Sequence, residues 1–289
     1  MSLAGDYGGS VVLGLNRGHN NLTNTIAAAQ TAVDKMGNLL AIELGNEPEY
    51  FANADQAITD GISWTPAADA ASQDNWDIWV GAAIAKKAII QAGVWLTTGG
   101  GAAGVSPTYG AALWTMDYSL RAVASNVSRL YFHHGTVGNC QYCFWGVYDV
   151  GAPYYGATAA TAALAGASHI ASLDSGTTNY AAYATYDSSG KPLRVLLYNS
   201  DYFDGTGTRS SQTFELTGLT ATTVLAKRLT AANALSRVDQ GSPPTWGGQE
   251  YTNGNCVVSG TETFETTTVT AGAATFTLQA AEALLVNLQ

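Results

Sequence analysis

A short, mostly apolar run, Leu39–Leu44, constrains this chain more than any other stretch of its sequence. The run is long enough for one strand that is buried on both faces, as strands of parallel sheets are. Gly45 and Pro48 then break it, so Asn46 and Glu47 fall where the predicted strand ends and a loop begins. A carboxylate beside an amide, followed by a proline that fixes the turn, suits a general acid/base.

The residues before this run complete a β-α-β unit. We expect a buried strand at Val11–Leu15 and a helix from about Thr23 to Met36, which Gly37 ends. One apolar face of this helix is formed by Leu22, Ile26, Ala29, Val33 and Met36. Such a unit requires parallel strands, and in a (β/α)8 barrel catalytic side chains collect at the carboxyl ends of the strands. We therefore expect Asn46 and Glu47 on a catalytic rim, with an ordinary strand-to-loop turn as the alternative.

Three further helices are expected before residue 174, at Gln73–Ala92, Tyr109–Ala124 and Pro153–Leu173. Short strands are expected at Val94–Thr97 and Arg129–His133. Trp76 and Trp79 lie on the apolar stripe of the first of these helices, which favours core packing over a sugar platform. The glycine run 99–101 lacks the Lys-Ser/Thr sequel of a phosphate loop, which argues against a nucleotide site.

From about Ser175 the sequence changes to the two-residue alternation of β-strands. Short strands separated by Gly, Asn, Asp and Pro turns are typical of a β-sandwich. The candidates are Tyr180–Tyr186, Leu193–Tyr198, Gln212–Leu216, Thr222–Leu229, Ala274–Leu278 and Ala283–Leu288. The predicted fold class is therefore α/β plus all-β, with a partial (β/α)8 barrel at 1–174 and a C-terminal β-sandwich at 175–289 that folds on its own.

Composition narrows the choice of partners and compartment. The net charge of −10 argues against nucleic acid and anionic membranes as partners. No run approaches the roughly 18 apolar residues of a membrane span, and Met1–Asp6 lacks the features of a signal peptide. Charged residues make up only 12% of the 289 residues, a pattern that indicates an extracellular protein. Two N-glycosylation sequons, at Asn21 and Asn126, fit a secretory history.

The three cysteines are Cys140, Cys143 and Cys256. A single Cys-x-x-Cys is compatible with a redox motif, half of a zinc site or a disulfide. No second pair follows, so we favour a disulfide, local or longer-range, with its pairing open. No metal and no cofactor is expected.

Three motifs carry a resemblance to a known enzyme family. Asn46-Glu47-Pro48 resembles the acid/base motif of the large clan of retaining glycoside hydrolases that are built on the (β/α)8 barrel. Two longer matches follow, at Tyr109–Tyr118 and from Tyr131 through Gly146. Together they resemble the fungal members of glycoside hydrolase family 79, the β-glucuronidase and heparanase-like enzymes.

The resemblance implies a secreted enzyme that removes terminal glucuronic acid from a glycan or glycoside with retention of configuration. It implies Glu47 as the acid/base and Asn46 as the ligand of the sugar 2-hydroxyl. It also implies that backbone NH groups and a tyrosine after the last barrel strand hold the uronate carboxylate. The candidates for this role are His133, His134, Gly135, Gly138 and Tyr142. For Phe144 and Trp145, core packing and a platform role remain equally open.

The second carboxylate of a retaining enzyme is missing from the expected place. Retention needs a nucleophile about 5–5.5 Å from the acid/base, and the resemblance expects a Glu at the end of strand seven. Between Glu49 and Glu215 the sequence contains no Glu. Asp117 falls within a predicted helix and Asp149 late in a loop, so neither is placed like a rim nucleophile.

The spacing of the motifs leads to the same conclusion. A (β/α)8 barrel contains roughly 31 residues per βα unit, so the segment from strand four to helix seven is about 90–100 residues long. From Glu47 to Trp114 the chain advances only 67 positions. We therefore expect a shortened barrel whose open sheet edges favour aggregation or a partner. The alternative to an impaired glucuronidase is a non-catalytic carbohydrate-binding or structural protein.

Overall fold

The computed structural model describes residues 11–15, 22–43, 104–124, 130, 132, 143–145, 150–252 and 254–289. The chain divides into two compact units, Met1–Ala85 and Lys86–Gln289. No helix in the described part of the chain is both long enough and apolar enough to cross a membrane.

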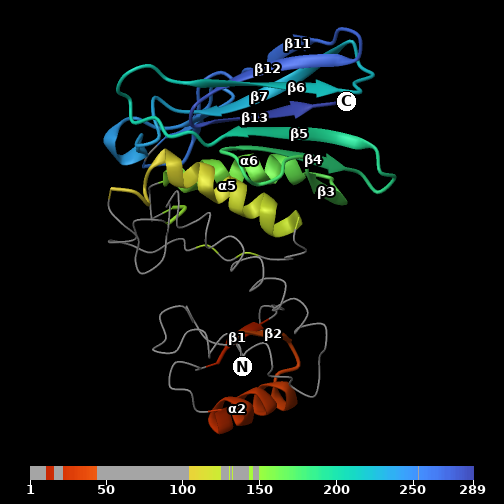
Figure 1. The fold of residues 1–289 in the computed structure, drawn as a ribbon. Helices are drawn as coiled ribbons and strands as arrows, with labels where there is room; N and C mark the ends of the chain where they lie inside the picture. The colour runs from red at the N-terminus through yellow and green to blue at the C-terminus, as the bar shows by residue number, and fades with distance from the viewer. Residues whose placement is uncertain are drawn as a thin grey trace. The chain divides into compact units, whose positions relative to one another are not determined.

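The first unit contains the predicted β-α-β arrangement (Figure 1). Strands β1 (Val11–Gly14) and β2 (Leu39–Glu43) pair in parallel, and α2 (Leu22–Lys35) lies between them in the sequence. Gly14 is paired with Glu43, so the two strands end at the same edge of the sheet. The sequence reaches Asn46 and Glu47 a few residues after β2 leaves this edge.

The apolar face predicted for α2 is buried only in part. Ala29 and Ala32 are each 4% exposed, whereas Ile26 is 37% and Val33 is 50% exposed. Small side chains allow a helix to approach its neighbours closely, so the alanine side is buried and the larger side chains remain on the flank. Of the predicted apolar face, Ala29 is therefore buried, whereas Ile26 and Val33 are exposed.

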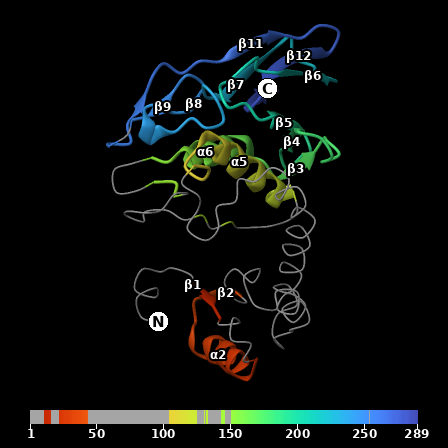
Figure 2. The same cartoon turned by 60° about the vertical axis from the view of Figure 1, so that its left-hand side comes forward.

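The second unit consists of three layers (Figures 1 and 2). Helices α5 (Tyr109–Ala124) and α6 (Ala152–Leu164) cover one face of a large antiparallel sheet. Its strands lie in the order β11-β7-β13-β5-β4-β3, with β8 also paired to β7. The pair β6–β12 covers the opposite face, and a short ribbon is formed by β9 and β10.

The strands of the second unit have the following bounds: β3 His169–Ser172, β4 Tyr180–Tyr186, β5 Pro192–Asn199, β6 Ser211–Thr217, β7 Thr223–Thr230, β8 Thr245–Trp246, β9 Glu250–Tyr251, β10 Val258–Ser259, β11 Glu265–Thr268, β12 Ala273–Gln279 and β13 Glu282–Asn287. The six predicted strands are confirmed to within about one residue at each end. The other five were not predicted, because they are too short to show an alternating pattern.

Two predictions before residue 174 need correction. The helix expected at Pro153–Leu173 ends at Leu164, because Gly166 takes a left-handed conformation with φ of 69° and the chain then forms β3. Leu130 and Phe132, within the strand expected at Arg129–His133, belong to no strand. The helix at 73–92 with Trp76 and Trp79, the strand at 94–97 and the glycine run 99–101 lie outside the described residues.

Two hydrophobic cores hold the three layers together. The first lies between the helices and the large sheet and includes Met116, Leu120, Tyr155, Tyr183 and Leu196. The second lies between the large sheet and β6–β12 and includes Val224, Phe276, Leu278, Leu284 and Val286.

The two helices approach each other at a glycine. A Cβ atom on Gly156 of α6 would lie 1.8 Å from the carbonyl oxygen of Ala112 on α5. Any larger residue at this position forces the helices apart, so the contact requires glycine.

The predicted boundary near residue 174 cuts through the first of these cores, since α5 and α6 precede it and the large sheet mostly follows it. The boundary itself stays a prediction, and two shortened chains test it. We expect residues 104–289 to unfold cooperatively, as judged by circular dichroism and calorimetry. Residues 175–289 lack the helix layer, so they expose the apolar face of the sheet to water. This exposure lowers the free energy of unfolding by about 25 cal/mol per Å² of apolar surface.

The shorter chain is therefore expected to melt at a lower temperature and to bind more of a hydrophobic dye. Equal melting temperatures for the two chains would show that the β-strands are self-sufficient and that the boundary near 174 is right.

Candidate active site

The predicted site residues all lie outside the described residues; they are Asn46, Glu47, His133, His134, Gly135, Gly138 and Tyr142. The same holds for Asp149. The structure does describe their nearest neighbours in sequence. These are Glu43 at the end of β2, Phe132 directly before His133, and Cys143–Trp145 directly after Tyr142.

Phe132 and Phe144 stack on each other across the two ends of the predicted uronate-binding segment 133–142. Their ring centroids are 4.9 Å apart and the rings are nearly parallel, at 26°. Phe132 also meets the rings of Trp114 and Tyr118 on α5, at 6.4 and 6.3 Å. Phe144 meets Tyr154 on α6 at 6.4 Å. Both residues that flank this segment are therefore anchored to the helix layer.

The chain just after the segment is also fixed by a disulfide and by a close backbone contact. Cys143 is disulfide-bonded, in line with the disulfide favoured for the Cys-x-x-Cys motif, whereas Cys256 carries an exposed free thiol. The Gly151 amide donates to the Phe144 carbonyl at 2.8 Å. A Cβ atom on Gly151 would lie 2.3 Å from the Cys143 carbonyl oxygen, so this contact requires glycine. Within the described ranges no three His, Cys, Asp or Glu side chains gather as a metal site.

The structure gives different answers for Phe144 and Trp145 on the choice between core packing and a platform role. Phe144 is only 7% exposed and packs between aromatic rings on three sides, so it serves core packing. Trp145 is 38% exposed and keeps part of its ring on the surface. Of these two side chains, only that of Trp145 is therefore accessible to a ligand.

Asp117, which we considered as a substitute nucleophile, is held by two side chains of the second unit. Its carboxylate accepts hydrogen bonds from Arg121 Nε at 3.1 and 3.0 Å and a short one from the Tyr183 hydroxyl. The Arg121 guanidinium lies over the Tyr183 ring, 5.4 Å from its centroid. The group joins α5 to the large sheet, and burial followed by the Asp117 charge raises the pKa of Tyr183 well above its usual range. Asp117 therefore serves the packing of α5.

Asp174 is held in the same way, in the turn between β3 and β4. Burial opposes its ionisation, but hydrogen bonds from the amides of Ala182 and Gly176 and from the Ser172 hydroxyl hold its pKa below the ordinary value. Arg121 adds an ion pair at 3.7 Å.

Comparison with known proteins places this arrangement in a family. Residues 182–285 match the glycosyl hydrolase family 79 C-terminal beta domain. The crystal structure of a 4-O-α-L-rhamnosyl-β-D-glucuronidase from Fusarium oxysporum 12S, in complex with Rha-GlcA, is 42% identical in sequence. The alignment covers 100% of this chain and 79% of that chain, with a TM-score of 0.76. The chain belongs to glycoside hydrolase family 79.

A second relative supports the assignment over a shorter stretch. A β-glucuronidase from Aspergillus niger is 33% identical over 120 residues, which are 38% of this chain. The match spans only 22% of the length of that enzyme.

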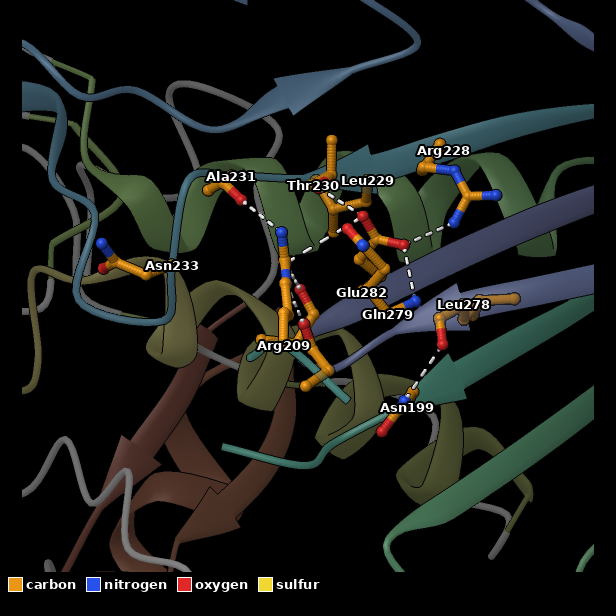
Figure 3. Close-up of polar contacts among 12 residues, drawn as sticks. Asn199, Arg209, Arg228, Leu229, Thr230, Ala231, Asn233, Leu278, Gln279 and Glu282 are labelled. Atoms are coloured by element: carbon orange, nitrogen blue, oxygen red, sulfur yellow. Dashed lines mark hydrogen bonds and ion pairs between the residues drawn. The ribbon is translucent and has the colours of Figure 1, made fainter. Parts of the chain in front are cut away.

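The family 79 β-domain contains a buried carboxylate, that of Glu282, which is 5% exposed (Figure 3). It accepts hydrogen bonds from Arg228 Nη1 at 2.6 Å, from the Thr230 hydroxyl at 2.8 Å and from the Gln279 amide at 2.9 Å. Arg209 Nη2 lies 4.0 Å from it. The carboxylate is thus enclosed by donors from β7 and from the turn between β12 and β13.

Arg209 completes this network by binding backbone carbonyl groups (Figure 3). It donates to the carbonyls of Ala231, Ala280 and Ala281, the last two in the turn before β13. Ala281 has a positive φ of 55°, a conformation that is strained for a residue with a Cβ atom. The network therefore holds a strained turn in the family 79 β-domain, and its role is structural.

Sequence reasoning did not single out Tyr154 and Tyr251, although both lie in the aromatic cluster around Phe144. Tyr154 fell within a predicted helix, and Tyr251 within a segment without periodicity. The adjacent aromatics Tyr154 and Tyr155 at the start of a helix were the one available signal.

We expect Glu282→Gln to lower the free energy of unfolding by about 1.5–3 kcal/mol, because Arg209 and Arg228 lose a buried counter-charge while Arg228 keeps its ion pair with the exposed Glu265. The matched control is Glu262→Gln, since Glu262 is 47% exposed and pairs with Lys227 at the surface. The control is expected to cost no more than about 1 kcal/mol. Urea unfolding of both variants measures the difference, and equal losses would contradict a structural role for the buried network.

Proposed function

We propose that this chain derives from a retaining β-glucuronidase and binds a terminal glucuronic acid of a glycan or glycoside. Its main support is the 42% identity to the Fusarium oxysporum enzyme, whose structure contains Rha-GlcA. In this proposal Glu47 is the general acid/base and Asn46 binds the sugar 2-hydroxyl. The uronate carboxylate is bound by residues from the set His133, His134, Gly135, Gly138 and Tyr142.

The first unit supports a barrel origin for this site. Its parallel strands end at a common edge, and Glu47 follows that edge directly in the sequence. Both flanks of α2 are open: Ile26 and Val33 are exposed on one flank. On the other there is an open hollow of about 430 Å³ lined by Leu13, Asn24, Ala27, Ala28, Thr31, Ala32 and Met36. A helix within a barrel has a neighbouring helix on each side, so we propose that this unit is part of a shortened barrel.

We further propose that this chain does not turn over β-glucuronides. No Glu stands between Glu49 and Glu215, where the nucleophile of a retaining enzyme is expected. The described carboxylates Asp117 and Glu282 do not substitute for it, because each is held by arginine in the second unit. A general acid alone contributes about 10²–10⁴-fold, far less than the roughly 10⁶–10¹⁷-fold that enzymes supply. A non-catalytic carbohydrate-binding role is the second candidate.

The extracellular assignment also remains a proposal. The disulfide at Cys143 supports it, because disulfides persist mainly in oxidising compartments.

An activated aryl β-glucuronide with and without azide tests the missing nucleophile. The activated leaving group relaxes the need for a general acid, while azide can take the place of a missing carboxylate. We expect no turnover without azide, and any azide-dependent release to show that the sugar binds. Release without azide would show that the chain contains a nucleophile after all.

A further inference from the structure

Helix α2 of the first unit is exposed and yet almost free of charge. Its residues from Leu22 to Val33 include no charged side chain, and its two charges, Asp34 and Lys35, stand at its end. Most of its described side chains are exposed. A helix that faces water usually carries charged residues on its outer face, whereas the centres of protein interfaces are depleted of charge. This composition is typical of a helix that another protein covers.

One side of α2 presents two branched apolar side chains, here called the apolar flank: Ile26, which is 37% exposed, and Val33, which is 50% exposed. Seven residues separate them, so they lie two helical turns apart on the same side of the helix, at a distance of about 10 Å along its axis. The apolar flank therefore projects two knobs from an otherwise uncharged helix.

The other side of α2 borders the hollow of about 430 Å³. Its lining is mostly small and apolar and includes Leu13, Ala28, Ala32 and Met36. The Thr31 hydroxyl donates to the Ala27 carbonyl at 2.7 Å, so this polar group is satisfied within the helix. Along α2 the hollow extends at least from Asn24 to Thr31, which are also seven residues apart. It therefore offers room for side chains at the spacing of the apolar flank, as when the ridges of one helix pack into the grooves of another.

The strands of the first unit have matching open edges. Among the described strands, β1 and β2 pair only with each other, so each has one edge without a partner. Such an edge is a template for a strand of another chain. The hollow includes Leu13 of β1, so it lies toward β1, and the apolar flank lies toward β2. Each side of the unit thus combines one half of a helix contact with one open strand edge.

We propose that copies of this chain associate head to tail through the first unit. The apolar flank of one copy fits into the hollow of the next copy, and β2 of the first pairs in parallel with β1 of the second. A second copy is the partner, because every copy carries both halves of the contact, on opposite sides of the same helix. A two-fold symmetric contact would place the apolar flank against itself and leave the hollow unfilled. This inference goes beyond the proposed function and involves no sugar ligand.

Sedimentation of the full chain, whose monomer mass is 30.0 kDa, tests the association. We expect an average mass above that of the monomer, which rises with protein concentration. We also expect added salt to strengthen the association, because the net charge of −10 makes copies repel each other while the contact itself is uncharged. A chain that stays monomeric overturns the proposal, and so does an association that salt weakens.

Two variants block one half of the contact each. Val33→Glu adds a charge to the apolar flank and Ala28→Glu adds one to the hollow, and each is expected to raise the dissociation constant at least roughly tenfold. Gln30→Glu is the matched control, since Gln30 is exposed on the same helix but belongs to neither surface. An equal loss in the control overturns the proposal.

Mixing the two blocked variants tests the head-to-tail arrangement itself. Val33→Glu keeps an intact hollow and Ala28→Glu an intact apolar flank, so the mixture is expected to form one contact and to stop at a heterodimer. Unfolded variants would not regain association on mixing, so the heterodimer also shows that both variants fold. A mixture that remains monomeric overturns the proposal.

Discussion

The packing of α5 on the large sheet is the contact on which the second unit depends. At its centre the Asp117 carboxylate joins Arg121 to the Tyr183 hydroxyl, and apolar residues such as Met116 and Leu120 fill the space around it. The same helix presents Trp114 on another side, where it meets Phe132. The sheet thus fixes α5, and α5 in turn fixes one end of the segment that is predicted to bind the uronate.

A comparable chain of contacts runs through α6. Tyr155 faces the core, while Tyr154 contacts Phe144 and Trp145. The helix layer of the second unit therefore supports both flanks of a predicted site segment. Asp117 is paired with Arg121 and Glu282 with Arg228, so these two carboxylates help to hold the second unit together.

Much of the fold could be predicted from sequence where periodicity is strong. The helix at Tyr109–Ala124 and six strands follow from it, because burial on one face leaves a regular pattern. Strands of two to four residues leave no such pattern, and β3 was taken for the end of a helix. The exposure of Val33 was not predictable either, because a sequence shows that a helix has an apolar face but not whether a neighbour covers it.

The residues of the candidate site also fall into those that the sequence can predict and those that it cannot. The motifs predict Glu47 and the segment 133–142 as site residues, because each motif is a run of neighbouring residues, and these assignments stay predictions. The contacts among Trp145, Tyr154 and Tyr251 could not be predicted, because these residues come together only through folding. Asp117 could be rejected as a nucleophile from its place in a helix, and the structure adds the physical reason in its bonds to Arg121 and Tyr183.

The close approach of the two helices at Gly156 limits how far the helix layer can deform. With the Ala112 carbonyl against the Gly156 backbone, α5 and α6 have no room to slide past each other. Phe132 packs on Trp114 of α5 and Trp145 packs on Tyr154 of α6, although neither residue belongs to a helix itself. A pair of helices that cannot slide gives both rings a rigid base, so the helices contribute nothing to any change in the distance between these rings.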